Sequence, residues 1–127
     1  MAPEAMSSYF TEEELRCKCG CNKNYFDETF LHVLNTIRGE CGFALPVSSG
    51  YRCPEHPVEA AKDKPGAHST GKAVDINISG WKAYRLVENA IALGVWRIGV
   101  NQKGTASQRF IHLDACHDLP EPVIWSY

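Results

Sequence analysis

The sequence lacks any apolar run that approaches the ~18–20 residues of a transmembrane helix. It also lacks a basic block, and 13 Lys and Arg stand against 15 Asp and Glu, so we expect no nucleic-acid partner. Residues 1–14 carry acids and no apolar core, which argues against a secretory signal peptide. With six cysteines in 127 residues, the chain is too poor in cysteine for a disulfide scaffold.

What the sequence does contain is typical of one globular domain. Hydrophobic residues make up 44% and charged residues 22% of the chain, so disorder is not expected. We interpret residues 1–127 as a single domain, with residues 1–8 flexible.

Local signals predict three helical segments. Thr11 and Glu14 form a capping box for a short helical turn. Asp27 is placed to cap a longer helix, in which apolar residues recur at helical spacing, with Gly39 and Gly42 marking its end. Ser79 is the expected cap of a helix over about residues 81–93 that ends at Gly94. Its expected buried face carries Tyr84, Val87 and Ile91.

Extended segments are expected at residues 45–52, 73–78, 96–100 and 110–114. Residues 53–66 are polar and rich in proline, and we interpret them as a long functional loop. Residues 119–127 form an apolar tail that we expect to pack onto the domain. This order predicts an α+β fold, in which helices pack on one face of a small, mainly antiparallel sheet.

Two of the predicted strands carry ionisable groups opposite their apolar faces. The alternation of a strand directs His112 and Asp114 to one side, and it directs Asp75 away from Val74 and Ile76. If the two strands are neighbours, these three groups converge. His68 precedes Asp75 by seven residues, and a tight turn at Gly71 would bring it over the strand end.

Two imidazoles and a carboxylate are a ligand set for catalytic zinc. The alternative is that these histidines and acids are ordinary surface or turn residues, since their spacing alone is a weak signal.

The motifs that carry this chemistry resemble a known family. In order, they are Ser49-Gly50-Tyr51-Arg52-Cys53-Pro54, Gly66-Ala67-His68-Ser69-Thr70-Gly71-Lys72-Ala73-Val74-Asp75-Ile76, Arg97-Ile98-Gly99-Val100 and Phe110-Ile111-His112-Leu113-Asp114. They resemble the zinc D-alanyl-D-alanine carboxypeptidases, a family of peptidoglycan peptidases whose fold is shared by Hedgehog signalling domains. The resemblance runs from about Tyr9 to the end of the sequence. The start of the chain, Phe-Thr-x-x-Glu-Leu followed by clustered cysteines, is similar to phage-borne members.

The resemblance implies that His68, Asp75 and His112 bind Zn²⁺. It also implies that Arg52 anchors a substrate carboxylate, or alternatively polarises the scissile carbonyl. This chain departs from the family in two places. Gly66 stands where many members have serine, and Arg109 and Phe110 occupy the positions where relatives often carry an acid or a histidine.

Asp114 is then the best remaining candidate for the general base, and equally a candidate for orienting His112. His117, His56 and His32 are weaker candidates for the site: a loop-surface residue, a residue of the long loop, and a helix residue that is solvent-facing or packed.

The cysteines allow three readings. Cys17, Cys19 and Cys21 could bind a structural metal from an irregular loop, with Cys53, Cys116 or a histidine as fourth ligand. They could instead form disulfides with Cys41, Cys53 or Cys116, or all could be free thiols.

The function implied by the resemblance is that of a zinc metallopeptidase. It would hydrolyse an amide bond in the peptide stems of peptidoglycan, as a D-Ala-D-Ala carboxypeptidase or an endopeptidase, with a phage endolysin as one expected form. The alternatives are a non-catalytic zinc-bearing module, for example in a virion, and a cysteine-stapled structural domain. We expect a monomer that has a peptidoglycan peptide as its partner. We expect it in a phage particle, in the host cytoplasm with release to the cell wall, or secreted by a route that needs no signal peptide.

Overall fold

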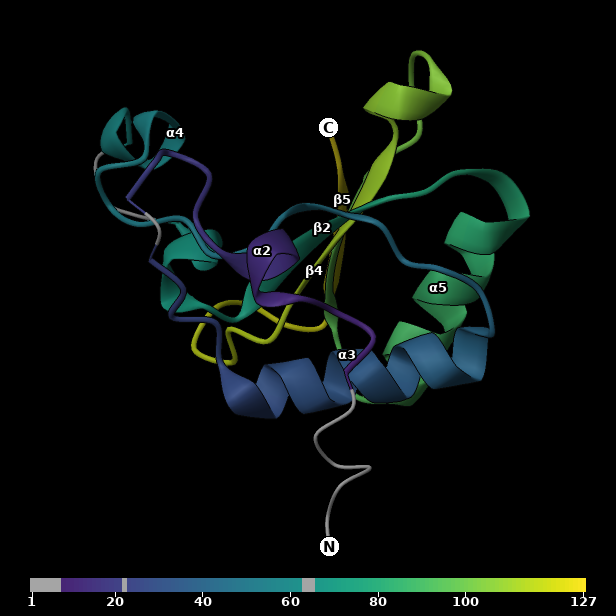
Figure 1. The fold of residues 1–127 in the computed structure, drawn as a ribbon. Helices are drawn as coiled ribbons and strands as arrows, with labels where there is room; N and C mark the ends of the chain where they lie inside the picture. The colour runs from purple at the N-terminus through teal and green to yellow at the C-terminus, as the bar shows by residue number, and fades with distance from the viewer. Residues whose placement is uncertain (1–7, 22, 63–65) are drawn as a thin grey trace, which may run out of the picture.

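The computed structural model describes residues 8–21, 23–62 and 66–127, which form an α+β fold around a five-stranded sheet (Figure 1). Most of the segment expected to be flexible, residues 1–8, lies outside the described residues. The helices are α2 (Glu12–Leu15), α3 (Glu28–Cys41), α4 (Pro57–Ala60) and α5 (Gly80–Ala92), with the short 3₁₀ turns η1 (Ala67–Thr70) and η2 (Ala106–Gln108). The strands are β1 (Val47–Ser49), β2 (Ala73–Asn77), β3 (Arg97–Asn101), β4 (Phe110–Asp114) and β5 (Val123–Ser126).

The first two helices begin where the sequence predicts. The Thr11 hydroxyl accepts the N–H of Glu14, and the Glu14 carboxylate accepts the N–H of Thr11, which completes the capping box. The Asp27 carboxylate accepts the N–H of Phe30 at 2.8 Å and so caps α3. This helix ends at Gly42, which has a φ of 76°, whereas Gly39 lies inside it.

The expected buried face of α5 is wrong. Tyr84 is 69% exposed and Ile91 52% exposed, while Ala83, Leu86 and Ala90 are buried; Val87 is partly buried against the core. The helix is therefore turned by about one residue from the predicted orientation. The buried set includes two alanines, and small side chains allow a helix to lie close to its neighbours. The larger apolar groups then remain at the surface.

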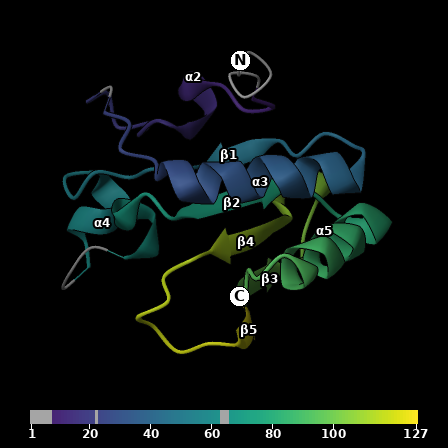
Figure 2. The same ribbon diagram turned by 90° about the horizontal axis from the view of Figure 1, so that it is seen from below.

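The sheet has the strand order β1-β2-β4-β3-β5. All neighbours are antiparallel except β3 and β5, which are parallel. Figure 2 shows α3 lying across the sheet with α5 beside it. The apolar side chains of β2, β4 and β3 face these helices and form the core together with them, through Val74, Ile76, Ile98, Ile111, Leu113, Phe30, Leu34, Ile37 and Leu86. The predicted helices on one face are thus confirmed, and the opposite face is left for polar groups.

Three segments differ in detail from the prediction. The extended stretch at residues 45–52 contains only the short strand β1, and the loop from Cys53 contains the single turn α4. Residues 63–65 of that loop lie outside the described residues. The apolar tail does pack down, and it does so as the edge strand β5, where the Val123 N–H donates to the Trp96 carbonyl at 2.8 Å. None of the helices in the described part of the chain has the length and apolarity needed to cross a membrane.

Candidate metal centre

The pairing of β2 with β4 places Asp75 directly opposite His112. The same antiparallel register pairs Val74 with Leu113 and Ile76 with Ile111 on the core face. Because side chains alternate along a strand, fixing these apolar pairs also fixes Asp75 and His112 on the other face. Facing side chains of adjacent strands have Cβ atoms about 5 Å apart, so these two groups are held within reach of one another.

His68 reaches the same point from η1, just before β2. Gly71 ends η1 with a φ of 77°, which lets the chain turn sharply into the strand. A Cβ at this glycine would lie 2.1 Å from the Tyr25 carbonyl oxygen, because the backbone of the segment before α3 packs directly against the turn. The tight turn expected at Gly71 is therefore present, and it carries His68 over Asp75.

The three groups meet at one oxygen. Asp75 Oδ1 lies 2.9 Å from His112 Nδ1 and 3.2 Å from His68 Nε2. All three residues are buried, and their ligand atoms lie within 4.8 Å of one another. The structure thus brings together the ligand set that the sequence suggests.

Partners on the far side of each ring fix which nitrogen faces this point. The Nδ1–H of His68 donates to the Gly50 carbonyl at 2.8 Å, which leaves Nε2 as the lone-pair atom. In neutral His112, the Nε2–H donates to Asp114 Oδ2 at 2.7 Å, which leaves Nδ1 as the lone-pair atom. Two nitrogen lone pairs therefore converge on a carboxylate oxygen. Such a group of electron-pair donors requires a cation or a proton between its members.

The electrostatics of the cluster agree with this requirement. Burial alone would raise the pKa of Asp75, but hydrogen bonds with His112 and His68 outweigh it and lower the pKa. Burial alone would lower the pKa of His112, but hydrogen bonds with Asp114 and Asp75 outweigh it and raise the pKa. The site therefore favours an ionised carboxylate with positive charge beside it.

Asp114 lies behind His112, away from Asp75. Its Oδ2 takes the Nε2–H of His112, while its Oδ1 accepts the Arg97 Nε–H at 2.8 Å and the Cys116 N–H at 3.1 Å. Burial raises the pKa of Asp114, but these bonds outweigh the effect and lower it. With 1% of the residue exposed and both oxygens engaged, Asp114 has the position of a group that orients His112.

Arg52 lies on the opposite side of Asp75. Its NH2 is 3.5 Å from Asp75 Oδ2, and its NH1 donates to Glu59 Oε2 at 3.0 Å. Glu59 is itself buried, and its carboxylate also binds Lys62 and the Gly66 N–H. The guanidinium is thus held beside the three-residue cluster by a buried carboxylate that the sequence analysis did not single out. No short motif marks Glu59, because it lies in the loop that contains α4.

The cluster, Asp114 and Arg52 line a cleft of about 360 Å³. Its walls also include Lys62, Trp125 and Tyr127, which were not predicted as site residues. Trp125 comes from β5 and packs against His112 with ring centroids 5.3 Å apart. A Cβ on the facing Gly99 would lie 2.7 Å from this indole, so glycine makes room for it. Trp125 reaches the cleft only because β5 pairs with β3, and the sequence did not predict this pairing.

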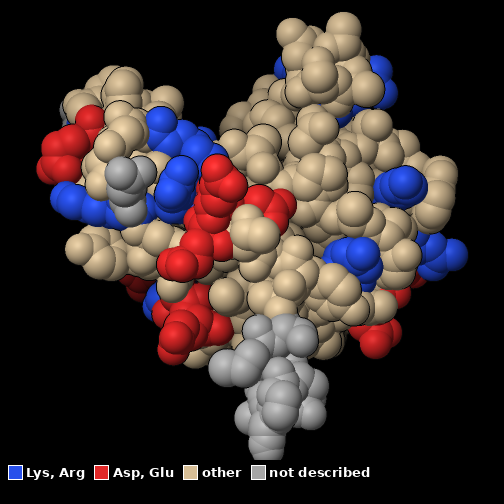
Figure 3. Space-filling view, viewed as in Figure 1, with Lys and Arg blue, Asp and Glu red and all other residues tan. Residues whose placement is uncertain are grey.

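The molecular surface is hollowed between the lobe that contains α4 and the lobe of the β3–β4 connection (Figure 3). On the same face, acidic side chains gather over α2, whose first turn carries Glu12, Glu13 and Glu14.

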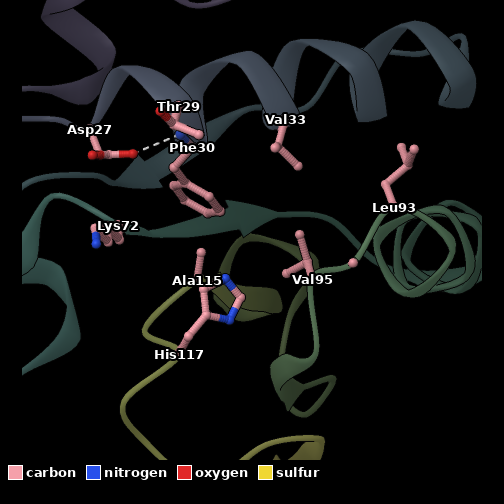
Figure 4. A pocket seen from close by; sticks show the side chains of 10 residues that line it. Asp27, Thr29, Phe30, Val33, Lys72, Leu93, Val95, Ala115 and His117 are labelled. Carbon is pink, nitrogen blue, oxygen red and sulfur yellow. Dashed lines mark hydrogen bonds between the residues drawn. The ribbon is translucent and has the colours of Figure 1, made fainter.

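A second cavity of about 360 Å³ lies between α3 and the ends of β2 and β4, and it contains none of the cluster (Figure 4). Its Asp27 carboxylate is directed at the Phe30 N–H that it caps, and His117 stands at its wall. His117 pairs with Glu121 at 2.9 Å, while His56 caps α4 by accepting the Val58 N–H. His32 is exposed on α3. The structure therefore places these three histidines outside the cluster.

Comparison with protein families gives a match to the peptidase M15 model over residues 8–114. The match covers most of the chain, and the chain belongs to this family, that of the zinc D-alanyl-D-alanine carboxypeptidases. Comparisons with curated proteins and with solved structures gave no match. M15 peptidases are zinc-dependent, and the cluster of His68, Asp75 and His112 is a group that could bind the metal. Two imidazole nitrogens and one carboxylate oxygen fit zinc by the chemistry of the donor set.

Proposed function

We propose that this protein is a zinc metallopeptidase that hydrolyses an amide bond in the peptide stems of bacterial peptidoglycan. The observation that carries the proposal is the convergence of the His68 and His112 lone pairs on Asp75 at the wall of an open cleft. A buried structural site would have no need of such an opening, whereas a hydrolytic site must admit a peptide.

In the proposed mechanism, His68 Nε2, His112 Nδ1 and Asp75 Oδ1 would hold the zinc. When bound, zinc would supply an activated water and a Lewis acid for the scissile carbonyl. The Gly50 carbonyl and Asp114 keep the two rings in the tautomers that this binding needs.

Arg52 is the residue that we propose acts on the substrate. Its guanidinium lies 3.5 Å from Asp75, so it faces the reacting carbonyl rather than a distant part of the peptide. It can therefore stabilise the negative charge that develops on the carbonyl oxygen during attack. Glu59 fixes its orientation from behind. Tyr127 lines the same cleft, and burial raises the pKa of its phenol, which stays protonated and able to donate a hydrogen bond.

One feature of the cleft favours the rival function, that of a non-catalytic zinc-bearing module. Among the described residues lining the cleft, the carboxylates are Asp75 and Asp114 and the imidazoles are His68 and His112, and all four are engaged with one another. No further acid or histidine on those walls is free to take a proton from water. A non-catalytic zinc-bearing module, for example a virion component, would show the same feature.

One experiment decides between them. The wild-type protein and His68→Ala are each assayed for zinc content and for soluble peptides released from purified cell walls of several stem-peptide types. His32→Ala, an exposed helix residue, is the matched control. Released fragments identified by mass spectrometry show which bond is cut, and therefore whether the enzyme is a carboxypeptidase or an endopeptidase.

We expect the wild type and His32→Ala to release peptides from the cell walls. Release should be lost in His68→Ala and in the presence of a chelator. Zinc binding without release from any wall would establish the non-catalytic module. Release that resists the chelator would overturn the zinc mechanism. The proposal further places the protein at the cell wall as a phage lysin or virion component, and lysis of intact cells by added protein tests that role.

A further inference from the structure

We propose a second, structural metal site, formed by the thiolates of Cys17, Cys19, Cys21 and Cys53. It is separate from the histidine cluster, and nothing in the proposed peptidase chemistry requires it. The four sulfur atoms lie within 4.8 Å of one another, at the junction between the loop after α2 and the segment that carries Arg52.

The positions of the four sulfur atoms fit a tetrahedrally coordinated metal ion. Cys53 Sγ lies 3.6 Å from that of Cys17, 3.4 Å from that of Cys19 and 3.6 Å from that of Cys21. Cys17 and Cys19 are 3.4 Å apart. A Zn–S distance of about 2.3 Å in a tetrahedron places sulfur atoms about 3.8 Å from one another. Four thiols this close have a volume between them that suits one zinc ion.

The backbone is shaped around the sulfurs. Gly20 has a φ of 100°, a conformation that allows the chain to turn between Cys19 and Cys21, whose sulfurs both lie near Cys53. The Cys53 N–H lies 3.3 Å from Cys17 Sγ, and the Lys23 N–H lies 3.4 Å from Cys21 Sγ. N–H groups directed at sulfur stabilise metal-bound thiolates by hydrogen bonding.

The pattern fits a metal better than a disulfide. Cys53 is about equally close to three sulfurs from one five-residue loop, whereas a disulfide would use one of them and leave two thiols with no role. Cys41 and Cys116, the other disulfide candidates, lie outside the group. The structure therefore assigns Cys53 as the fourth ligand that the sequence left open.

The position of the site indicates which parts of the chain the metal would hold together. The Tyr51 N–H donates to the Leu15 carbonyl at 2.8 Å, so the two strips of chain that supply the cysteines are already paired. The strip that supplies Cys53 also carries the Gly50 carbonyl, which orients His68, and Arg52, which faces the cleft. A metal bound to Cys53 would fix this segment to the N-terminal loop. The ion thus holds the Gly50 carbonyl and Arg52 in place at the cleft.

The test measures zinc per chain in full-length protein purified with reductant, by native mass spectrometry and elemental analysis. The double variant Cys19→Ser/Cys21→Ser should lose one zinc equivalent, and Cys41→Ser, a half-buried cysteine outside the group, should lose none. His68→Ala should keep the cysteine-bound ion. Cobalt-substituted His68→Ala should show thiolate-to-cobalt charge-transfer absorption, and the zinc absorption edge of the same variant should fit four sulfur ligands.

The outcomes separate this site from the peptidase proposal. One zinc in the wild type that survives His68→Ala supports the cysteine site and contradicts zinc at the histidine cluster. Zinc content unchanged in Cys19→Ser/Cys21→Ser overturns the cysteine site. If that variant fails to fold, the cobalt and X-ray spectra of His68→Ala decide, and the absence of sulfur ligation overturns it. A disulfide that includes any of the four cysteines, found by peptide mapping of protein purified without reductant, would overturn it as well.

Discussion

Asp114 Oδ2 lies 2.7 Å from Nε2 of His112, on the side of the imidazole opposite Asp75. The ring therefore stands between this carboxylate and the cluster of electron-pair donors. Of the two roles that the sequence left open for Asp114, this geometry favours orienting the histidine over taking a proton from water.

The first prediction concerns this pair. Asp114→Asn removes the negative charge behind His112 while keeping the size of the side chain, so zinc affinity should fall about 10- to 100-fold. Activity should largely return at saturating zinc. Zinc titration and peptide release at several zinc concentrations measure both effects, with the exposed Asp118→Asn as control. Normal zinc affinity combined with lost activity would instead make Asp114 the base.

The second prediction separates the two roles of Arg52. If the guanidinium stabilises charge on the scissile carbonyl, Arg52→Lys should lower kcat about 100- to 1000-fold with zinc content unchanged. If Arg52 anchors a remote carboxylate, KM should rise while kcat holds. Steady-state kinetics on a released stem peptide distinguish the cases. Arg85→Lys, in an exposed ion pair with Glu88 on α5, should change neither constant.

The third prediction concerns pH and Glu59. Burial raises the pKa of this carboxyl, but the Gly66 N–H, Arg52 and Lys62 outweigh it and lower the pKa to about 2. A lowered pKa stabilises the fold above the unfolded value of 4.5, and this stability is lost as pH falls toward about 2. The free energy of unfolding of wild type should therefore exceed that of Glu59→Gln by a constant amount above about pH 5. The gap should close below that. A gap that does not vary between pH 3 and 7 would contradict the assignment.

The fourth prediction compares two glycines with nearly equal backbone angles. Gly71 and Gly42 have φ of 77° and 76°, but an added Cβ meets the Tyr25 carbonyl at Gly71 and nothing within 4 Å at Gly42. Gly42→Ala should cost about 1 kcal/mol of stability, the strain of a left-handed alanine. Gly71→Ala should cost clearly more and should weaken zinc binding, because it displaces the turn that carries His68. Denaturant unfolding and zinc titration measure the two effects; equal costs would contradict the steric argument.

Several features of this protein follow from short stretches of sequence. Thr11 and Asp27 cap helices through bonds that reach three residues, and the alternation in β4 separates Ile111 and Leu113 from His112. The motifs around His68, Asp75 and His112 resemble those of the family to which the chain belongs. These signals are readable because each depends on residues near one another in the chain.

Other features depend on contacts between distant segments. The sequence did not predict the buried face of α5, the pairing of β5 or the Glu59–Arg52 ion pair. Each depends on contacts between distant residues, which the spacing of residues along the chain does not reveal. The role favoured for Asp114 depends on which side of the His112 ring it occupies.

The sequence by itself determined the capped helices, the two-faced strands and the set of residues able to bind a metal. Tertiary structure decided that Asp75 faces His112 and that Cys53 joins three cysteines more than thirty residues earlier. The physical reason is that the register of a strand pair and the closure of a loop are set by the whole core. A residue's type shows what chemistry it can perform, but its partners are chosen by the fold.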